Sequence, residues 1–457
     1  MKLPDSFTRS MKELFGTGYD DFIASFDSKS VSALRVNTSK ISLREFEAKT
    51  PYPLEKIPFV SDGYYINDTD AWSKHPYYFA GLFYLQEPSA MLAAEIMPVR
   101  EGDMVLDLCA APGGKSTKLA TKEPGLLVSN DISFSRTIPL VKNLEHFGCG
   151  NYFVTASDPE KLALAYGQYF DGILVDAPCS GEGMFRRDSS LMRTYDAESN
   201  VFYSRIQSEI LDSAYKMLKA GGYLLYSTCT FSDIENEQVV LKFLNDHKDM
   251  SAVSIDDKYC LCPAYDTYKD LRVYHFFPHK AQGEGHFIAL MKKEGKNQGS
   301  TLSQGTDACG KLPEACNDFL RHLSEKGTDS LNGKSFITGD DGYIYMLPEA
   351  SSGCIKPHIR YVRTGTVVGR IKNGRFVPHT AFALCLHADD FDNILSFHAD
   401  DPDVTRYLKG ETVVMDEKKS GVQKGWVLIC VDRFPLGFAK YDGKKIKNLY
   451  EKGWVMT

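Results

Sequence analysis

Apolar and polar positions alternate in blocks along the middle of the chain. Between residues 103 and 293, apolar runs of strand length are separated by amphipathic stretches of helical length. This alternation is typical of βαβ units, which build a parallel sheet covered by helices. The expected strands lie near 104–108, 126–130, 151–155, 171–176 and 222–228. Two later runs, 271–277 and 286–291, are separated by a glycine-bearing loop and predict a terminal antiparallel hairpin.

The two ends of the chain have a different pattern from the middle. Residues 1–95 mix short helical patterns with loops, and the polar stretch 294–312 is typical of a linker. Beyond it, a helical segment near 313–326 precedes many short β-like runs. The pattern therefore predicts a small N-terminal domain, an α/β core over 96–293, a linker, and a C-terminal region over 313–457.

Composition restricts the class of protein. Of the 457 residues, 43% are hydrophobic and 25% charged, which is ordinary for a soluble protein with a sizeable core. No apolar run approaches the ~18 residues of a membrane span, and the start of the chain lacks the apolar segment of a signal peptide. Eleven cysteines without framework spacing predict free thiols in a reducing cytoplasm. The net charge of −7 argues mildly against a nucleic-acid partner, although local charge matters more.

A glycine-rich segment separates the first expected strand from the next helical stretch. Its residues are Cys109, Ala110, Ala111, Pro112, Gly113, Gly114 and Lys115. A strand, a tight loop and a helix N-terminus together form a nucleotide cradle. The segment matches neither the dinucleotide fingerprint nor the P-loop. The sequence therefore favours an adenosyl ligand without phosphates.

Two acidic residues follow the next two expected strands. Asp131 lies about 20 residues beyond the loop, a spacing at which a carboxylate hydrogen-bonds ribose hydroxyls. Asp158 follows the third strand, where it could meet the exocyclic amine of adenine. The alternatives are a helix N-cap at Asp131 and a turn residue at Asp158, which precedes a proline.

Two cysteines follow the last two expected strands of the core. Cys179 ends the segment Asp176-Ala-Pro-Cys, and Cys229 lies in Ser-Thr-Cys-Thr. Loops at the carboxyl ends of parallel strands form the ligand crevice of an open α/β sheet. Two thiols there indicate nucleophilic chemistry beside the bound cofactor. The alternative for either site alone is a buried structural cysteine.

These motifs, in this order and spacing, resemble those of the RNA cytosine-5 methyltransferases of the bacterial RsmB and RsmF types. The resemblance covers about 90–293, and the tail segments 365–376 and 437–440 are similar to the PUA-like end of the RsmF subgroup. It implies a Rossmann-like methyltransferase sheet, a small N-terminal domain and a C-terminal PUA-like RNA-binding region. It also implies S-adenosylmethionine as cofactor and structured RNA as partner, with small-subunit ribosomal RNA as the expected substrate.

The resemblance also implies residue roles. A cysteine thiolate adds to C6 of cytosine, so that C5 becomes nucleophilic. The RNA family uses the Thr-Cys cysteine, which assigns Cys229 as nucleophile, Cys179 to product release and Asp176 to stabilising charge in the ring. DNA cytosine-5 methyltransferases use the Pro-Cys cysteine, which is the alternative. A predicted capping box over 232–235 would open a helix whose dipole favours a thiolate on Cys229. Lys115 would neutralise the methionyl carboxylate or contact RNA, and the alternative is a surface lysine at the start of a helix.

Cations gather in the C-terminal region. From Ser351 to His387 there is no Asp or Glu, and aromatic residues are interleaved with Lys and Arg. This composition suits phosphate contact with base stacking, and a solvated basic surface is the alternative. The expected RNA contacts are Arg360, Arg363, Lys372 and Arg375. Cys260 and Cys262, with nearby histidines, meet no standard zinc spacing, so no metal is expected.

The sequence thus predicts a cytoplasmic RNA (cytosine-5) methyltransferase that acts on a structured RNA, with ribosomal RNA as the expected substrate. One alternative is a methyltransferase acting on transfer RNA or, less favoured, on DNA. The other is a non-catalytic RNA-binding ribosome-assembly factor on an inherited methyltransferase fold. The intact Asp176, Cys179 and Cys229 argue against that last alternative.

Overall fold

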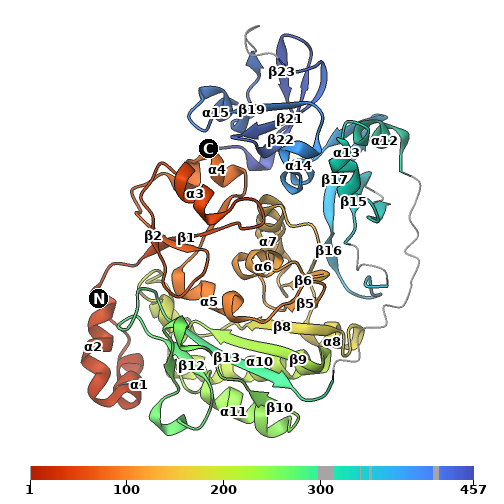
Figure 1. Ribbon diagram of the computed structural model, residues 1–457. Helices are drawn as coiled ribbons and strands as arrows, with labels where there is room; N and C mark the ends of the chain where they lie inside the picture. Colours follow the sequence, from red (N-terminus) through yellow and green to blue (C-terminus); the bar gives the residue numbers. More distant parts are fainter. Residues whose placement is uncertain (1, 297–311, 340, 349–352, 415–420) are drawn as a thin grey trace.

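A mixed sheet of ten strands lies at the centre of the molecule (Figure 1). In the computed structural model, the described residues are 2–296, 312–339, 341–348, 353–414 and 421–457. The five parallel strands of the sheet come from the middle of the chain: β5 (Met104–Asp107), β6 (Leu126–Asn130), β7 (Tyr152–Thr155), β8 (Phe170–Asp176) and β9 (Leu218–Thr228). Their order is β9-β8-β5-β6-β7, so the order reverses between β5 and β8, where open α/β sheets bind ligands. The predicted Rossmann-like class is confirmed.

Alternate residues of these strands face opposite sides of the sheet. Leu106 and Val128 belong to one buried cluster, whereas Val105 and Leu127 belong to another. Both faces are buried, which explains why the strands read as continuous apolar runs. The helices that accompany them are α5 (Pro88–Ile96), α6 (Gly114–Ala120), α7 (Phe134–Phe147), α8 (Pro159–Ala165), α9 (Leu191–Thr194), α10 (Ala197–Met217) and α11 (Glu237–Asp246).

Antiparallel strands extend the sheet at both edges. The predicted hairpin is confirmed by β12 (Tyr274–Phe276) and β13 (His286–Lys293), and β13 pairs with β9. The short strands β10 (Met250–Ala252) and β11 (Cys262–Pro263) pair with these two.

At the far edge, β16 (Tyr361–Thr364) pairs antiparallel with β7. A strand from the C-terminal region therefore completes this edge of the core sheet. Most of the expected linker, 297–311, lies outside the described residues.

The N-terminal part has its own four-stranded sheet, ordered β2-β3-β1-β4. Its elements are α1 (Asp5–Phe15), α2 (Tyr19–Ala24), β1 (Ser32–Val36), α3 (Leu43–Lys49), β2 (Glu55–Lys56), β3 (Gly63–Ile66), α4 (Pro76–Phe79) and β4 (Phe83–Leu85). This small sheet packs beside α5 and α6 (Figure 1).

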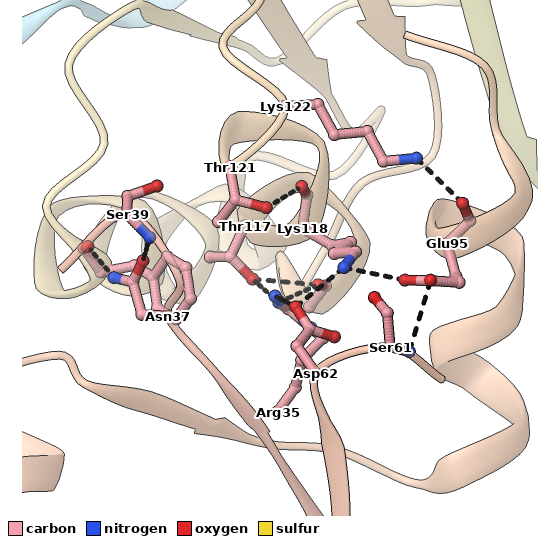
Figure 2. Close-up of polar contacts among 12 residues, drawn as sticks. Arg35, Asn37, Ser39, Ser61, Asp62, Glu95, Thr117, Lys118, Thr121 and Lys122 are labelled. Carbon is pink, nitrogen blue, oxygen red and sulfur yellow. Dashed lines mark hydrogen bonds and ion pairs between the residues drawn. The ribbon is translucent and has the colours of Figure 1, made fainter. Parts of the chain in front are cut away.

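Buried charges join the N-terminal sheet to α6 (Figure 2). Arg35 of β1 is fully buried, and its Nη2 donates a hydrogen bond to the Gly114 carbonyl at 3.1 Å. Lys118 Nζ lies 2.8 Å from both Asp62 Oδ2 and Glu95 Oε2. Because α6 begins at the end of the glycine-rich loop, this network holds that loop against the N-terminal domain.

The C-terminal region forms two small sheets above the core (Figure 1). The first contains β14 (Phe336–Thr338), β15 (Tyr343–Met346), β17 (Thr366–Lys372) and β18 (Arg375–Pro378). The second contains β19 (Ile394–Phe397), β20 (Val413–Val414), β21 (Gly425–Val431), β22 (Phe434–Tyr441) and β23 (Lys445–Asn448). The helices are α12 (Glu314–Leu320), α13 (Glu325–Ser330), α14 (Thr380–Cys385) and α15 (Pro402–Leu408). Across the described ranges, no helix combines the length and the apolar character that crossing a membrane requires.

Candidate active site

One cavity of about 800 Å³ lies beside the carboxyl ends of the parallel strands. Its lining brings together the predicted residues Cys109, Ala111, Asp131, Asp158, Asp176, Cys179 and Cys229. The other residues of the glycine-rich loop do not line it. Helix α10 contributes part of the wall through Ile206 and Ile210, a contribution that the sequence did not reveal.

The glycine-rich loop owes its shape to two glycines. Gly113 has φ of 111° and precedes α6, a left-handed conformation that glycine adopts without strain. A Cβ on Gly113 would lie 3.0 Å from Leu140, and one on Gly114 would lie 3.0 Å from Tyr84 and Gln86. The tight packing on both sides explains why two small residues occur together here.

Asp131 follows β6 and is almost completely buried, yet it lines the cavity. Its Oδ1 accepts a hydrogen bond from the Ser133 backbone N–H at 2.9 Å, and its Oδ2 lies 3.3 Å from Arg136. The N-cap of α7 is Ser133, so the alternative of Asp131 as N-cap is wrong. Asp158 lines the cavity but also caps α8, accepting from the Glu160 N–H at 2.8 Å.

The carboxylates around the cavity fit an adenosyl amino acid. Asp107, at the end of β5, is fully buried and does not line the cavity, and burial raises its pKa to about 7. Asp131, Asp158 and Asp176 do line it. An amine or hydroxyl donor from a ligand would pair with such acceptors, whereas several carboxylates would repel phosphates. The residues present therefore fit S-adenosylmethionine better than a phosphorylated nucleotide.

Asp176 accepts hydrogen bonds from both sides of the site. Lys115 Nζ donates to Oδ2 at 2.7 Å, and Ser227 Oγ donates to Oδ1 at 2.9 Å, while His286 Nε2 lies 3.6 Å from Oδ1. Burial acts to raise the pKa of Asp176, but Lys115 and His286 outweigh it and hold the pKa well below the usual range. Asp176 is therefore a carboxylate at neutral pH. Lys115 is mostly buried rather than a surface lysine.

Cys179 and Cys229 face each other across the site. Their Sγ atoms lie 3.3 Å apart, and both residues are partly exposed. The hydrogen bond to Cys229, together with burial, raises the pKa of Cys179 well above that of an ordinary thiol. Cys179 therefore keeps its proton, and it can donate a hydrogen bond to the Cys229 sulfur.

The predicted capping box over 232–235 is wrong. These residues form turns, and α11 begins only at Glu237, with an N-cap that makes no side-chain hydrogen bond. Glu235 is fully buried and accepts a hydrogen bond from the Ser180 backbone N–H instead. The helix-dipole argument for a thiolate on Cys229 therefore no longer holds, because the helix starts too far along the chain.

Family models match the chain from one end to the other. The model of the 16S rRNA methyltransferase RsmB/F matches 94–292, and that of the RsmF N-terminal domain matches 3–88. The RsmF first C-terminal domain matches 318–386, and the RsmF PUA domain matches 394–456. Ribosomal RNA small subunit methyltransferase F of Citrobacter koseri is 30% identical over 99% of this chain and 96% of its own length. The protein of that name from Cronobacter sakazakii shows the same identity and coverage. This chain belongs to the RsmF family.

Solved structures agree with this assignment. A methyltransferase homolog protein from Pyrococcus horikoshii is 26% identical, with a TM-score of 0.56, over 63% of this chain and 94% of that chain. NSun6 from the same organism, solved with SFG, has a TM-score of 0.56 at 22% identity and covers 64% of this chain and 99% of its own. That second likeness shows the fold. As an RsmF-family enzyme, the chain is an S-adenosylmethionine-dependent methyltransferase.

The four predicted RNA contacts of this RsmF-family chain have different environments. Lys372 and Arg375 are exposed and pair with each other across the β17–β18 hairpin. Arg360 is exposed, and its Cζ lies 4.0 Å from the centroid of the Phe134 ring. The expectation for Arg363 is wrong, because its mostly buried Nε lies 2.9 Å from Glu145 Oε1.

Two histidines of the hairpin region in this RsmF-family chain lie beside carboxylates. Among the described residues, no group of three or more metal-binding side chains is present. His275 is fully buried and lies 2.7 Å from Glu237, and His286 faces Asp176. The position of His286 beside Asp176 was not predicted, since it follows from pairing of β13 with β9.

Proposed function

We propose that this protein methylates C5 of a cytosine in small-subunit ribosomal RNA through a covalent bond between Cys229 and C6. The observation that carries the proposal is the pair of sulfur atoms 3.3 Å apart beside the ionised Asp176. One thiol can attack the ring while the second stays within reach of the same sulfur atom. A buried structural cysteine would not be expected to line a cavity or to face a second cysteine.

Cys229 starts the reaction. C5 of cytosine is a poor nucleophile, but addition of the Cys229 thiolate to C6 converts the ring into an enamine. S-adenosylmethionine, when bound, supplies the electrophilic methyl group that C5 takes up. We assign its adenosyl part to the glycine-rich loop, with Asp131 directed to the ribose and Asp158 to the adenine amine.

Asp176 stabilises the ring during addition. Because Lys115 and His286 keep it ionised, its carboxylate can accept a hydrogen bond from the exocyclic amine of the cytosine. Lys115 Nζ lies 2.7 Å from this carboxylate, so its role here is to keep Asp176 ionised.

Cys179 acts at the end of the reaction. After methylation, water or another base takes the C5 proton, the C5–C6 double bond forms again, and the bond between C6 and the Cys229 sulfur breaks with its electron pair returning to sulfur. A protonated Cys179, 3.3 Å from that sulfur, donates a hydrogen bond to the departing thiolate. The raised pKa of Cys179 suits this role, because an ionised Cys179 would repel the departing Cys229 thiolate.

The C-terminal region supports RNA as the substrate. The exposed Lys372 and Arg375 suit phosphate contact, and the RsmF PUA model matches the last part of the chain. Cys109, Cys179 and Cys229 carry free thiols, which fits a reducing cytoplasm. We therefore place the reaction in the cytoplasm, on ribosomal RNA or an assembling small subunit.

Bisulfite sequencing tests the proposal. Ribosomal and transfer RNA from cells with and without the gene are compared, because 5-methylcytosine resists the conversion that cytosine undergoes. The expected result is at least one cytosine of 16S rRNA that loses protection on deletion and regains it with the wild-type gene but not with Cys229→Ser. Loss of protection in transfer RNA alone would overturn the substrate assignment.

A further inference from the structure

Two buried carboxylates connect the loops that carry the two cysteines. Glu182 lies three residues after Cys179, and Glu235 lies six residues after Cys229. Both glutamates are at most 1% exposed. Neither lines the cavity, so neither is placed to touch substrate or cofactor.

Each carboxylate accepts a backbone hydrogen bond from the opposite loop. Glu235 Oε2 accepts from the Ser180 N–H at 3.0 Å, directly after Cys179. Glu182 Oε2 accepts from the Phe231 N–H at 2.9 Å, two residues after Cys229. The two contacts are reciprocal, so neither loop can shift along the other without breaking one of them.

Helix α10 connects the two carboxylates from behind. Asn200 Nδ2 donates to Glu235 Oε1 at 2.8 Å and to Glu182 Oε1 at 3.1 Å. Gln207 Nε2 donates to Glu235 Oε2 at 2.9 Å and to the Pro178 carbonyl at 2.9 Å. Every contact of Glu235 is therefore with a donor group, and both of its oxygens must accept.

This arrangement is costly for stability. Among the ion pairs formed by the described residues, neither Glu182 nor Glu235 has a Lys or Arg partner. Burial raises the pKa of Glu235 to about 7, although the hydrogen bond from Ser180 acts in the opposite direction. Two buried acidic groups without a cation are a poor way to stabilise a fold. A requirement for accurate loop placement explains their presence better.

We propose that Glu182 and Glu235 are positioning residues that hold Cys179 within hydrogen-bond distance of Cys229, so that the covalent intermediate can be released. The effect on release of the intermediate rests on the proposed function, whereas the hydrogen bonds that hold the two loops together are present without RNA. Loss of either carboxylate leaves Cys229 directly after the end of β9 and allows the Cys179 loop to move. The rate of release should therefore fall more than the rate at which the adduct forms.

Glu235→Gln is the sharpest variant. Glutamine has the size of glutamate, but its amide NH₂ must face one of the three donors around residue 235. These donors are the Ser180 N–H, Asn200 Nδ2 and Gln207 Nε2. The matched control is Glu145→Gln, which neutralises a buried carboxylate that contacts Arg363 rather than the cysteine loops. Asn200→Ala disturbs the same arrangement from α10 and serves as a second variant.

The first measurement needs neither RNA nor S-adenosylmethionine. Phenylarsine oxide reacts with two neighbouring thiols, forming two As–S bonds and releasing water, and peptide mass spectrometry identifies the bridged pair. We expect Cys179–Cys229 bridging in the full-length wild type and in Glu145→Gln, and bridging at least about tenfold slower in Glu235→Gln and Asn200→Ala. Cys179→Ser gives the background. Wild-type bridging rates in both Glu235→Gln and Asn200→Ala would overturn the proposal.

The second measurement follows single-turnover methylation in the same proteins. Glu235→Gln should slow release of the RNA adduct about 10- to 100-fold while adduct formation and S-adenosylmethionine affinity change little. Equal losses in formation and release would indicate a general structural defect and overturn the positioning role. The two proposals can fail separately. If the variants bridge more slowly but the wild type forms no RNA adduct, the positioning role is supported and the proposed function is contradicted.

Discussion

The sulfur atoms of Cys179 and Cys229 lie 3.3 Å apart, although 50 residues separate them in the chain. Their proximity follows from the parallel pairing of β8 with β9, in which Asp176 is opposite Ser227. Each cysteine comes two or three residues after that pair, where both strands end at the same edge of the sheet. Strand register thus brings the two cysteine loops to the same edge of the sheet, and the contacts between the loops set the distance between the sulfur atoms.

Asp131→Ala should weaken S-adenosylmethionine binding about 10- to 100-fold, because it removes the buried carboxylate that we propose hydrogen-bonds the ribose. Isothermal titration calorimetry measures the affinity. The exposed Asp400→Ala is the control and should bind like the wild type. Unchanged affinity in Asp131→Ala would place the adenosyl group elsewhere.

Lys372→Ala and Arg375→Ala should each reduce the salt slope of RNA binding by about one, since each removes one phosphate contact. Fluorescence anisotropy at several salt concentrations measures the slope. Lys242→Ala, on an exposed face of α11, should leave it unchanged. If the hairpin variants retain the wild-type slope, the basic hairpin is only a solvated surface.

Arg363→Ala should lower the free energy of unfolding by about 3 kcal/mol, because Glu145 then stays buried without its partner. Urea denaturation measures this loss. Arg360→Ala, which removes an exposed cation from the Phe134 ring, should cost less than about 1 kcal/mol. Similar small effects in both variants would show that the Arg363 pair does not stabilise the fold.

Lys115→Gln should raise the pKa of Asp176 and so bring an acid limb into the pH–rate profile between pH 4 and pH 8, where Asp176 of the wild type stays ionised. Without the cation, burial dominates and raises the pKa of Asp176. In the wild type the depressed pKa of Asp176 contributes stability that is present above its unfolded pKa of ~3.9 and lost as the pH falls below it. Single-turnover rates between pH 4 and pH 8 measure the limb, with the exposed Lys161→Gln as control. An acid limb unchanged in Lys115→Gln would contradict this role.

The sequence was informative wherever the structure depends on local pattern. The five core strands and their terminal loops could be predicted, because strand periodicity and turn residues are properties of neighbouring positions. The segments containing Cys179 and Cys229 could therefore be assigned to one edge of the sheet. The distance between their sulfur atoms could not, since it depends on side-chain packing across two loops.

Features that depend on distant partners were missed or wrong. Arg363 was expected at the surface, but β16 pairs with β7 and turns its side chain toward Glu145, more than 200 residues earlier in the sequence. Ser232–Glu235 matched a capping box, but donors at Ser180 and Asn200 draw Glu235 into the interior. In both places long-range hydrogen bonds override a local preference.

The central claim, that Cys229 is the nucleophile and Cys179 assists release, is tested most directly by RNA–protein adducts on denaturing gels. Wild type, Cys229→Ser and Cys179→Ala are incubated with S-adenosylmethionine and an RNA whose target cytosine is unpaired, since the base must leave its stack. The account predicts an accumulating adduct with Cys179→Ala, and neither adduct nor methylation with Cys229→Ser. A stalled adduct with Cys229→Ser and none with Cys179→Ala would contradict it and assign the attack to Cys179.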